Sequence, residues 1–265
     1  MPRASFGFVF GAFLAIALSL TTRGAVPAPL DEAFQKLARD SGSWAYTEVS
    51  VTVDKNGKKS AETIVGFDPS KPFPEQFTPL QIDGRPPTDK QRAQYRRAGE
   101  SRGRRFEEQE NAARDELLRL HVSGRWIVVD LEHATVAEET ETSLLYEVAL
   151  LPDNAANALP AEKFRLQARV NKADRTFEHA ELSLREPLKL TKFAKLSALS
   201  YRFGFANVDA NFSPAAISLH ADTTGSMFFF GRHEVREITR RDVRHVTPYR
   251  SRFGVKIGPL KTIDF

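Results

Sequence analysis

Residues 164–205, FRLQARVNKADRTFEHAELSLREPLKLTKFAKLSALSYRFGF, decide the fold class. Apolar and polar residues alternate through the first strand-like run, whose apolar members are Phe164, Leu166, Ala168 and Val170. A polar turn at 171–175 leads to further runs, and the last of them has one apolar side made of Leu199, Tyr201, Phe203 and Phe205. One polar side per strand is typical of an antiparallel sheet that is solvated on one face and covered on the other.

Further strand-like runs extend this pattern along most of the chain. Residues 43–67 predict a hairpin, because two alternating runs meet at Asn56-Gly57, a dipeptide preferred in tight turns between strands. More short runs follow Gly124, and a short amphipathic helix is expected at 30–38. Consecutive strands with short gaps imply an antiparallel meander rather than parallel strands joined by crossover helices. We therefore expect an α+β fold in a single domain that spans residues 26–265.

A charged helical insertion is expected at about 86–120. It follows residues 67–80, whose four prolines predict a loop or an irregular sheet edge, since proline lacks an amide donor. Thr88 is suited to cap a helix and Asp89 to occupy its first turn. The apolar spacing changes at Phe106, which predicts a second helix that reaches Leu120.

The first of these helices carries a strong excess of positive charge. Between residues 85 and 105 there are eight basic and two acidic side chains. One interpretation is a solvated lid that pairs with the acidic segment 107–116. The other is contact with an anionic partner, such as lipid headgroups or an acidic envelope protein. The candidates for such contact are Arg92, Arg96, Arg97, Arg104 and Arg105.

The N-terminal segment predicts the compartment. Arg3 precedes an uncharged apolar run at 6–20, and small residues follow at 24–25. This layout is typical of a secretory signal peptide, and the run is shorter than the about 20 residues of a membrane-spanning helix. We expect cleavage of residues 1–25 and a periplasmic or secreted mature chain without a transmembrane span. Retention as an N-terminal anchor is the alternative.

The composition limits the classes of partner. The chain has no cysteine, so it has neither a disulfide framework nor a cysteine for acylation. Its formal net charge is only +4, and the basic residues concentrate in one helix rather than over a broad face. Nucleic acid is therefore not expected as a partner.

Catalytic and metal motifs are not evident in the sequence. The six histidines are dispersed, and HEVRE at 233–237 has glutamate where a zinc-binding helix needs its second histidine. No phosphate-binding loop, dinucleotide fingerprint or nucleophile elbow occurs. We therefore expect a non-enzymatic protein with no catalytic residues, metal site or cofactor.

The most apolar segment after residue 25 is GSMFFFG, residues 225–231. Consecutive apolar residues of a strand point to both faces of a sheet. The run therefore predicts either a strand in the core or a strand with one face lining an apolar cavity.

Two segments, FDPSKPFPEQFTPLQIDGRPPTDKQ at 67–91 and the run at 164–205, carry a family resemblance. With the short N-terminal helix, a first strand that contains Trp44 and the hairpin at Asn56-Gly57, they resemble the LolA/LolB-like periplasmic lipoprotein-carrier superfamily. Within it, the chain is most similar to uncharacterised proteobacterial envelope proteins of that fold.

This resemblance implies a strongly curved antiparallel sheet, an open half-barrel, with helices over its concave face and an apolar cavity between them. It implies an amphiphile carrier whose cargo is a lipid or an acylated protein. The candidates for lining the cavity are Trp126, Phe203, Phe205, Phe228 and Phe230. The alternative is an envelope protein-binding or sensing module whose half-barrel is filled by side chains.

Overall fold

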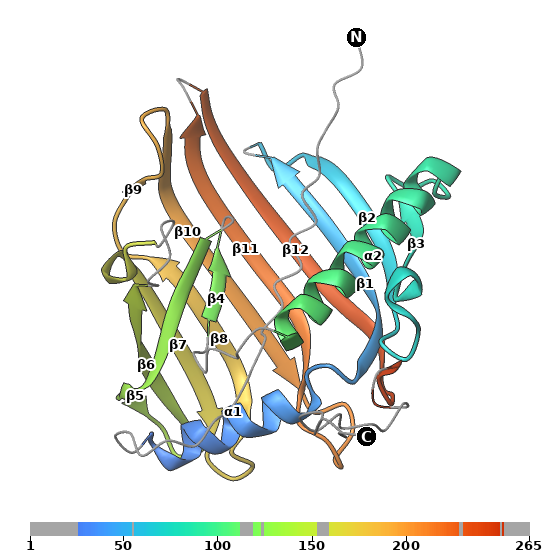
Figure 1. Ribbon diagram of the computed structural model, residues 1–265. Helices are drawn as coiled ribbons and strands as arrows, with labels where there is room; N and C mark the ends of the chain where they lie inside the picture. The colour runs from blue at the N-terminus through green and yellow to red at the C-terminus, as the bar shows by residue number, and fades with distance from the viewer. Residues whose placement is uncertain are drawn as a thin grey trace, which may run out of the picture.

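The computed structural model (Figure 1) describes residues 26–54, 56–111, 119–122, 125–152, 159–227, 230–249 and 251, without the side chains of 105–111, 119–126 and 227. Its helices are α1 (Ala28–Asp40) and α2 (Asp89–Asn111), with short 3-10 turns η1 (Phe73–Glu75) and η2 (Ala161–Lys163). Its strands are β1 (Trp44–Asp54), β2 (Lys59–Phe67), β3 (Phe77–Ile82), β4 (Arg119–Val122), β5 (Arg125–Glu139), β6 (Ser143–Pro152), β7 (Phe164–Asn171), β8 (Phe177–Leu184), β9 (Leu188–Lys189), β10 (Ala194–Ala206), β11 (Ala215–Met227) and β12 (Phe230–His245).

All these strands belong to one antiparallel sheet, so the α+β class is confirmed. The strand order is β3-β2-β1-β12-β11-β10-β8-β7-β6-β5-β4, and β9 pairs with the beginning of β10. The last strand, β12, pairs with the first, β1, which attaches the N-terminal hairpin to the end of the meander. The end strands β3 and β4 do not pair with each other, so the sheet is open. Both helices lie on the same face of it, called the helix face below (Figure 1).

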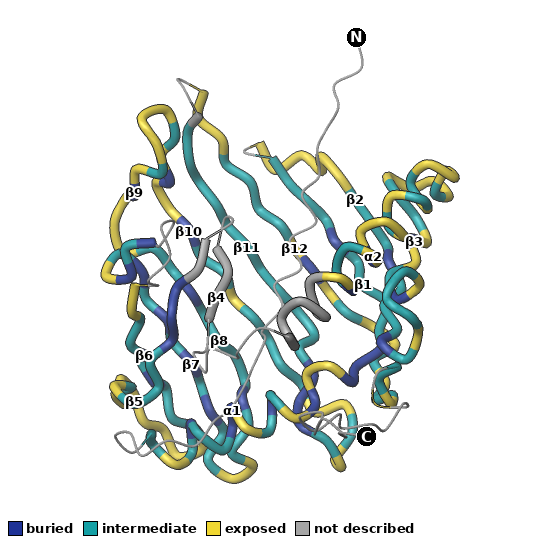
Figure 2. Tube along the Cα trace, in the orientation of Figure 1, coloured by how far each residue is buried: buried dark blue, intermediate teal, exposed yellow. Residues whose placement is uncertain are grey.

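Helix α1 covers the half of the helix face formed by β5 to β8, where the main core lies (Figure 2). Its sequence places Leu30, Ala33, Phe34 and Leu37 on one stripe, and all four are buried. Phe34 meets Phe177 of β8 edge to face, with 4.8 Å between ring centroids. Each large apolar side chain buried here stabilises the fold by about 1.5–3 kcal/mol. The expected helix at 30–38 is therefore confirmed, and it forms one wall of the core.

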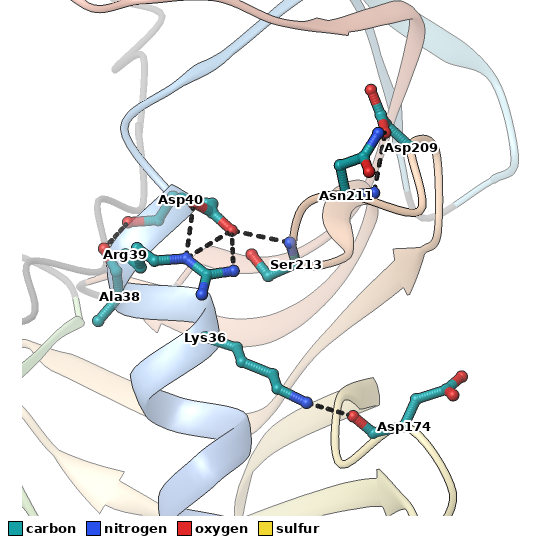
Figure 3. A network of polar contacts seen from close by, with 9 residues as sticks. Lys36, Ala38, Arg39, Asp40, Asp174, Asp209, Asn211 and Ser213 are labelled. Carbon is teal, nitrogen blue, oxygen red and sulfur yellow. Dashed lines mark hydrogen bonds and ion pairs between the residues drawn. The ribbon is translucent and has the colours of Figure 1, made fainter.

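A buried carboxylate fixes the C-terminal end of α1 (Figure 3). Asp40 is 5% exposed and accepts hydrogen bonds from Arg39 Nε at 3.1 Å and from the backbone N–H of Ser213 at 2.8 Å. Burial opposes its ionisation, but these hydrogen bonds outweigh burial and lower the pKa of Asp40. The contact ties α1 to the connection between β10 and β11, which no local pattern in the sequence indicates.

Helix α2 begins with the expected cap. Gln91 N–H donates to Thr88 Oγ1 at 3.3 Å, and Thr88 N–H donates to Gln91 Oε1 at 2.8 Å, a reciprocal pair that satisfies two amide donors. The predicted break at Phe106 is wrong, because α2 continues to Asn111. Leu120 is also not helical: it lies in β4, opposite Ile127 of β5. The apolar residues up to Leu120 have the spacing of a helix, but pairing with β5 at the edge of the sheet determines the structure of residues 119–122 instead.

Two glycines let α2 pack closely against η1. A Cβ built on Gly99 would lie 2.3 Å from the carbonyl oxygen of Phe73 and 2.8 Å from Pro74 Cα. A Cβ on Gly103 would lie 3.1 Å from the ring of Phe73. The charged helix is thus docked through its small residues, which places its long side chains elsewhere.

The described residues of the segment 225–231 belong to two different strands. Met227 ends β11, Phe230 begins β12, and the two residues pair directly. Phe230 is 81% exposed, so the expectation of a strand buried on both faces is wrong. The run lies where two strands reach the end of the sheet, and there the described residues supply no second layer to cover it.

The face of the sheet without helices is polar and rich in ion pairs. Glu147 pairs with Arg165 at 2.9 Å and also with Arg185, while Glu181 pairs with Arg202 at 2.7 Å. Partial burial opposes ionisation, yet hydrogen bonds from these arginines lower the pKa of both carboxylates. The prediction of one solvated and one covered face is therefore confirmed for these strands.

Candidate functional site

The helix face between α1 and α2 is built from rows of side chains that cross β10, β11, β12 and β1. The register defines two neighbouring rows, which are Phe203, Leu219, Ile238 and Ser50, and then Tyr201, Ala221, Arg236 and Thr52. Each row begins with an aromatic ring on β10 and ends with a hydroxyl on β1. The face therefore changes from apolar to polar over four strands.

Arg236 stands in the middle of this face. It is half-buried, and its Nε donates to Oγ of Ser50 at 2.8 Å. Tyr95 of α2 is close enough to feel its charge: burial raises the pKa of Tyr95, Glu48 raises it further, and Arg236 lowers it. Within the part of the chain that the structure describes, no carboxylate forms an ion pair with Arg236. Its guanidinium can therefore donate further hydrogen bonds to an anion.

Arg240, four residues further along β12, has a different role. Its Nε donates to Glu48 at 3.1 Å and its Nη1 to the carbonyl of Ala216 at 3.2 Å. Its guanidinium also lies 4.2 Å from the ring centroid of Tyr46. Because these contacts occupy the group from three sides, Arg240 holds β1, β11 and β12 together.

An aromatic ladder continues from Tyr46 toward α2. Its ring centroids are separated by 5.0 Å between Tyr46 and Phe67 and by 4.5 Å between Phe67 and Phe77. Arg102 of α2 lies over Phe77, 4.0 Å from the ring centroid. Burial raises the pKa of Tyr46 to about 12, so this ring sits in a poorly hydrated layer under the helix. The ladder makes α2 an anchored cover over β1 to β3.

The apolar half of the helix face is already filled. A hollow lined by Ala33, Leu37, Phe177, Phe205 and Pro214 leaves no room for a water molecule. A depression of about 260 Å³ lies elsewhere, between the β1–β2 and β11–β12 hairpins. Neither of these two spaces is an enclosed cavity that could hold a ligand.

The proposed cavity residues separate into three groups. Phe205 packs into the core, 5.8 Å from the ring centroid of Phe177, and Phe203 is half-buried on the helix face. Phe230 is exposed at a hairpin tip. The side chain of Trp126, opposite His121 in the β4–β5 pair, and the whole of Phe228 lie outside the described residues.

The proposed contact arginines lie on α2. Arg96, Arg97 and Arg104 are exposed, and the side chain of Arg105 lies outside the described residues. Arg92 pairs with Asp89 at 2.7 Å and also donates to the carbonyl of Pro87. Arg102 is not exposed like its neighbours, because it contacts Phe77. The acidic segment expected to pair with these arginines also lies outside the described side chains.

Histidines do not assemble into a site in the described part of the chain. HEVRE lies in β12, an extended strand, so its ends are not on one helix turn. His220 pairs with Glu237, and His233 Nε2 lies 2.9 Å from Asp222 Oδ1, both on the face without helices. Among the described residues no three His, Cys, Asp or Glu side chains gather as a metal site would require.

Sequence reasoning missed Arg236. The run REITRRD predicts a solvated, self-paired surface, and Arg236 has no special neighbour in the sequence. The available signal was alternation, since Glu234, Arg236, Ile238 and Arg240 share one side of β12. The buried Ile238 among them indicates that this side is the covered one.

No helix in the described residues combines the length and hydropathy needed to cross a membrane. No protein-family model, curated protein or solved structure matches the chain.

Proposed function

We propose that the chain is an exported, non-enzymatic protein of the cell envelope that binds an amphiphile, either a lipid or an acylated protein, on the helix face of its sheet. The site consists of the aromatic residues Tyr201 and Phe203 and the cation Arg236. The resemblance to half-barrel carriers and the secretory character of residues 1–25 agree with this assignment.

The observation that carries the proposal is the adjacency of an aromatic surface and a cation on one face. Tyr201 and Arg236 both pair with Ala221, from opposite sides, so they lie two strands apart. Two strand spacings amount to about 10 Å. An anionic headgroup at Arg236 would therefore let an acyl chain lie across β11 toward the rings of β10.

The energetics favour a chain over a small polar ligand. Each methylene removed from water contributes about 0.8 kcal/mol, and a hydrogen bond from a charged donor contributes about 1.5–3 kcal/mol. Six buried methylenes would thus contribute about 5 kcal/mol, more than the headgroup contact. The arginine then selects the sign of the headgroup, and the aromatic rings supply most of the affinity.

The test is native mass spectrometry of the mature protein purified from its own envelope, followed by organic extraction. We expect a reproducible extra mass that extracts as lipid. Occupancy should fall about tenfold in Arg236→Gln, the loss of one charged hydrogen bond. It should not change in Arg241→Gln, an exposed position on the same strand. A bare protein mass, with no uptake from added lipid, would refute the proposal.

A second candidate is a protein-binding or sensing module, and the filled apolar half of the helix face favours it. Exposed Lys90, Arg97 and Arg104 follow one another at seven-residue intervals, which places them along one outward stripe of α2. An acidic envelope protein would be the partner. Pull-down from an envelope extract should be lost at high salt and in the quadruple Ala variant of Arg96, Arg97, Arg104 and Arg105. Capture that survives both changes would count against this function.

A further inference from the structure

Three hairpin tips gather at one end of the sheet, and they form the surface that we call the tip end. Register places Lys195 opposite Ser226 and Ser226 opposite Gly231, so the beginnings of β10 and β12 lie beside the end of β11. Asp54 at the end of β1 pairs with Glu234, which brings the β1–β2 hairpin to the same end. Figure 1 shows these strand ends on one side of the sheet, and Figure 2 shows exposed residues beside the tips, at the start of β12 and in the turn between β9 and β10.

Two phenylalanines project from neighbouring tips. Phe193, just before β10, is 60% exposed, and Phe230, at the start of β12, is 81% exposed. They are the two most exposed large apolar side chains of the described residues. A cluster of exposed apolar surface is typical of an interaction site, and the exposed parts of these two rings lie at adjacent tips.

Positive charge surrounds these rings. The exposed basic residues of the tip end are Lys58, Lys59, Lys189, Lys192, Lys195 and Arg232. Lys59 pairs with Glu62, and Arg232 with Glu234. Within the described residues the other four form no ion pair with a carboxylate. Their charge therefore remains available to an anionic surface.

We propose that the tip end docks on the surface of an anionic lipid bilayer, with Phe193 and Phe230 in the interfacial layer and the lysines against the headgroups. Phenylalanine on the apolar side of a membrane-bound segment enters the boundary between headgroups and acyl chains, and each basic residue near an anionic surface strengthens binding about fivefold. Phe193 and Phe230 can reach such a surface together, because the start of β10 pairs with the end of β11 and the end of β11 pairs with the start of β12. This docking does not depend on ligand binding at Arg236.

The absence of cysteine makes a site-specific test clean. The variant Phe230→Cys of the mature chain is labelled at this position with an environment-sensitive fluorophore. It is mixed with vesicles of phosphatidylcholine alone or with vesicles that also contain about 30% phosphatidylglycerol, which gives them a strong negative surface potential. The control is Val208→Cys, which is 42% exposed in the connection between β10 and β11 at the other end of the sheet. We expect a blue shift with anionic vesicles at position 230 and none at 208.

Sedimentation with the same vesicles measures affinity without a label. Phe193→Ser with Phe230→Ser should weaken binding at least about tenfold, and Lys192→Gln with Lys195→Gln about twentyfold. Val208→Ser should bind like the wild type. All five altered positions are exposed, so circular dichroism should show an unchanged fold in each variant. Equal shifts at 230 and 208, equal binding to neutral vesicles, or binding only to a soluble acidic protein would overturn the proposal.

Discussion

Gly99 and Gly103 lie four residues apart on the docked face of α2, yet substitution by alanine should have opposite consequences. At Gly99 the new methyl group would fall 2.3 Å from a backbone oxygen and 2.8 Å from a backbone carbon of the η1 turn. Backbone cannot move aside without shifting η1 or the helix. At Gly103 the nearest atoms belong to the side chain of Phe73, at 3.1–3.2 Å, and a side chain can move by a few tenths of an ångström.

The magnitudes follow from two opposing effects. Alanine in a helix interior is about 1 kcal/mol more favourable than glycine. Overpacking costs about 1–3 kcal/mol, and contact with rigid backbone belongs at the upper end of that range. Gly99→Ala should therefore weaken the docking of α2 by about 2 kcal/mol. Gly103→Ala should range from neutral to about 1 kcal/mol more stable.

Amide hydrogen exchange of peptides from α2 measures this docking directly. Two kcal/mol corresponds to about thirtyfold faster exchange in Gly99→Ala, if the helix opens locally before it exchanges. Gly103→Ala should exchange as slowly as the wild type or more slowly. Peptides from β7 and β8 serve as the internal reference, since they lie under α1. Equal protection of α2 in both variants would refute the close approach of α2 to η1.

Two further predictions concern ionisable groups. Asp40→Ala should destabilise the protein by about 1–3 kcal/mol in urea unfolding at pH 7, because the buried N–H of Ser213 loses its acceptor. Folding lowers the pKa of Asp40, so the ionised carboxylate stabilises the folded protein above the unfolded pKa of about 4. The difference in the free energy of unfolding between wild type and Asp40→Ala should therefore narrow as the pH falls below about 4. A difference that stays constant with pH would contradict a role for the ionised carboxylate. Tyr46, with its pKa raised to about 12, should ionise last when tyrosinate absorbance is followed, and Tyr46→Phe should remove that late step. Because neutral Tyr46 is the form that folding favours, stability should fall as the pH rises above 10, and less so in Tyr46→Phe.

Local patterns predicted the elements that rest on local physics. Thr88 caps α2 as expected, Asn56-Gly57 joins two strands, and Gly57 has the positive φ of 74° that such a turn requires. Local patterns gave wrong predictions where contacts with residues distant in the sequence determine the secondary structure or the burial of a segment. Leu120 fits a helical stripe, but its segment pairs with β5 instead. The apolar run that ends at Phe230 has the composition of a core strand, but it lies at an end of the sheet.

The α+β class, the antiparallel meander and the highly basic helix follow from local patterns in the sequence, because alternation, turn chemistry and charge are properties of neighbouring residues. The pairing of β12 with β1 is a feature of the folded chain, and it places Arg236 beside Ser50 and two strands from Tyr201. It also brought Phe193 and Phe230 to adjacent tips. These pairs are distant in sequence, and their proximity depends on strand order and register, which no local preference specifies.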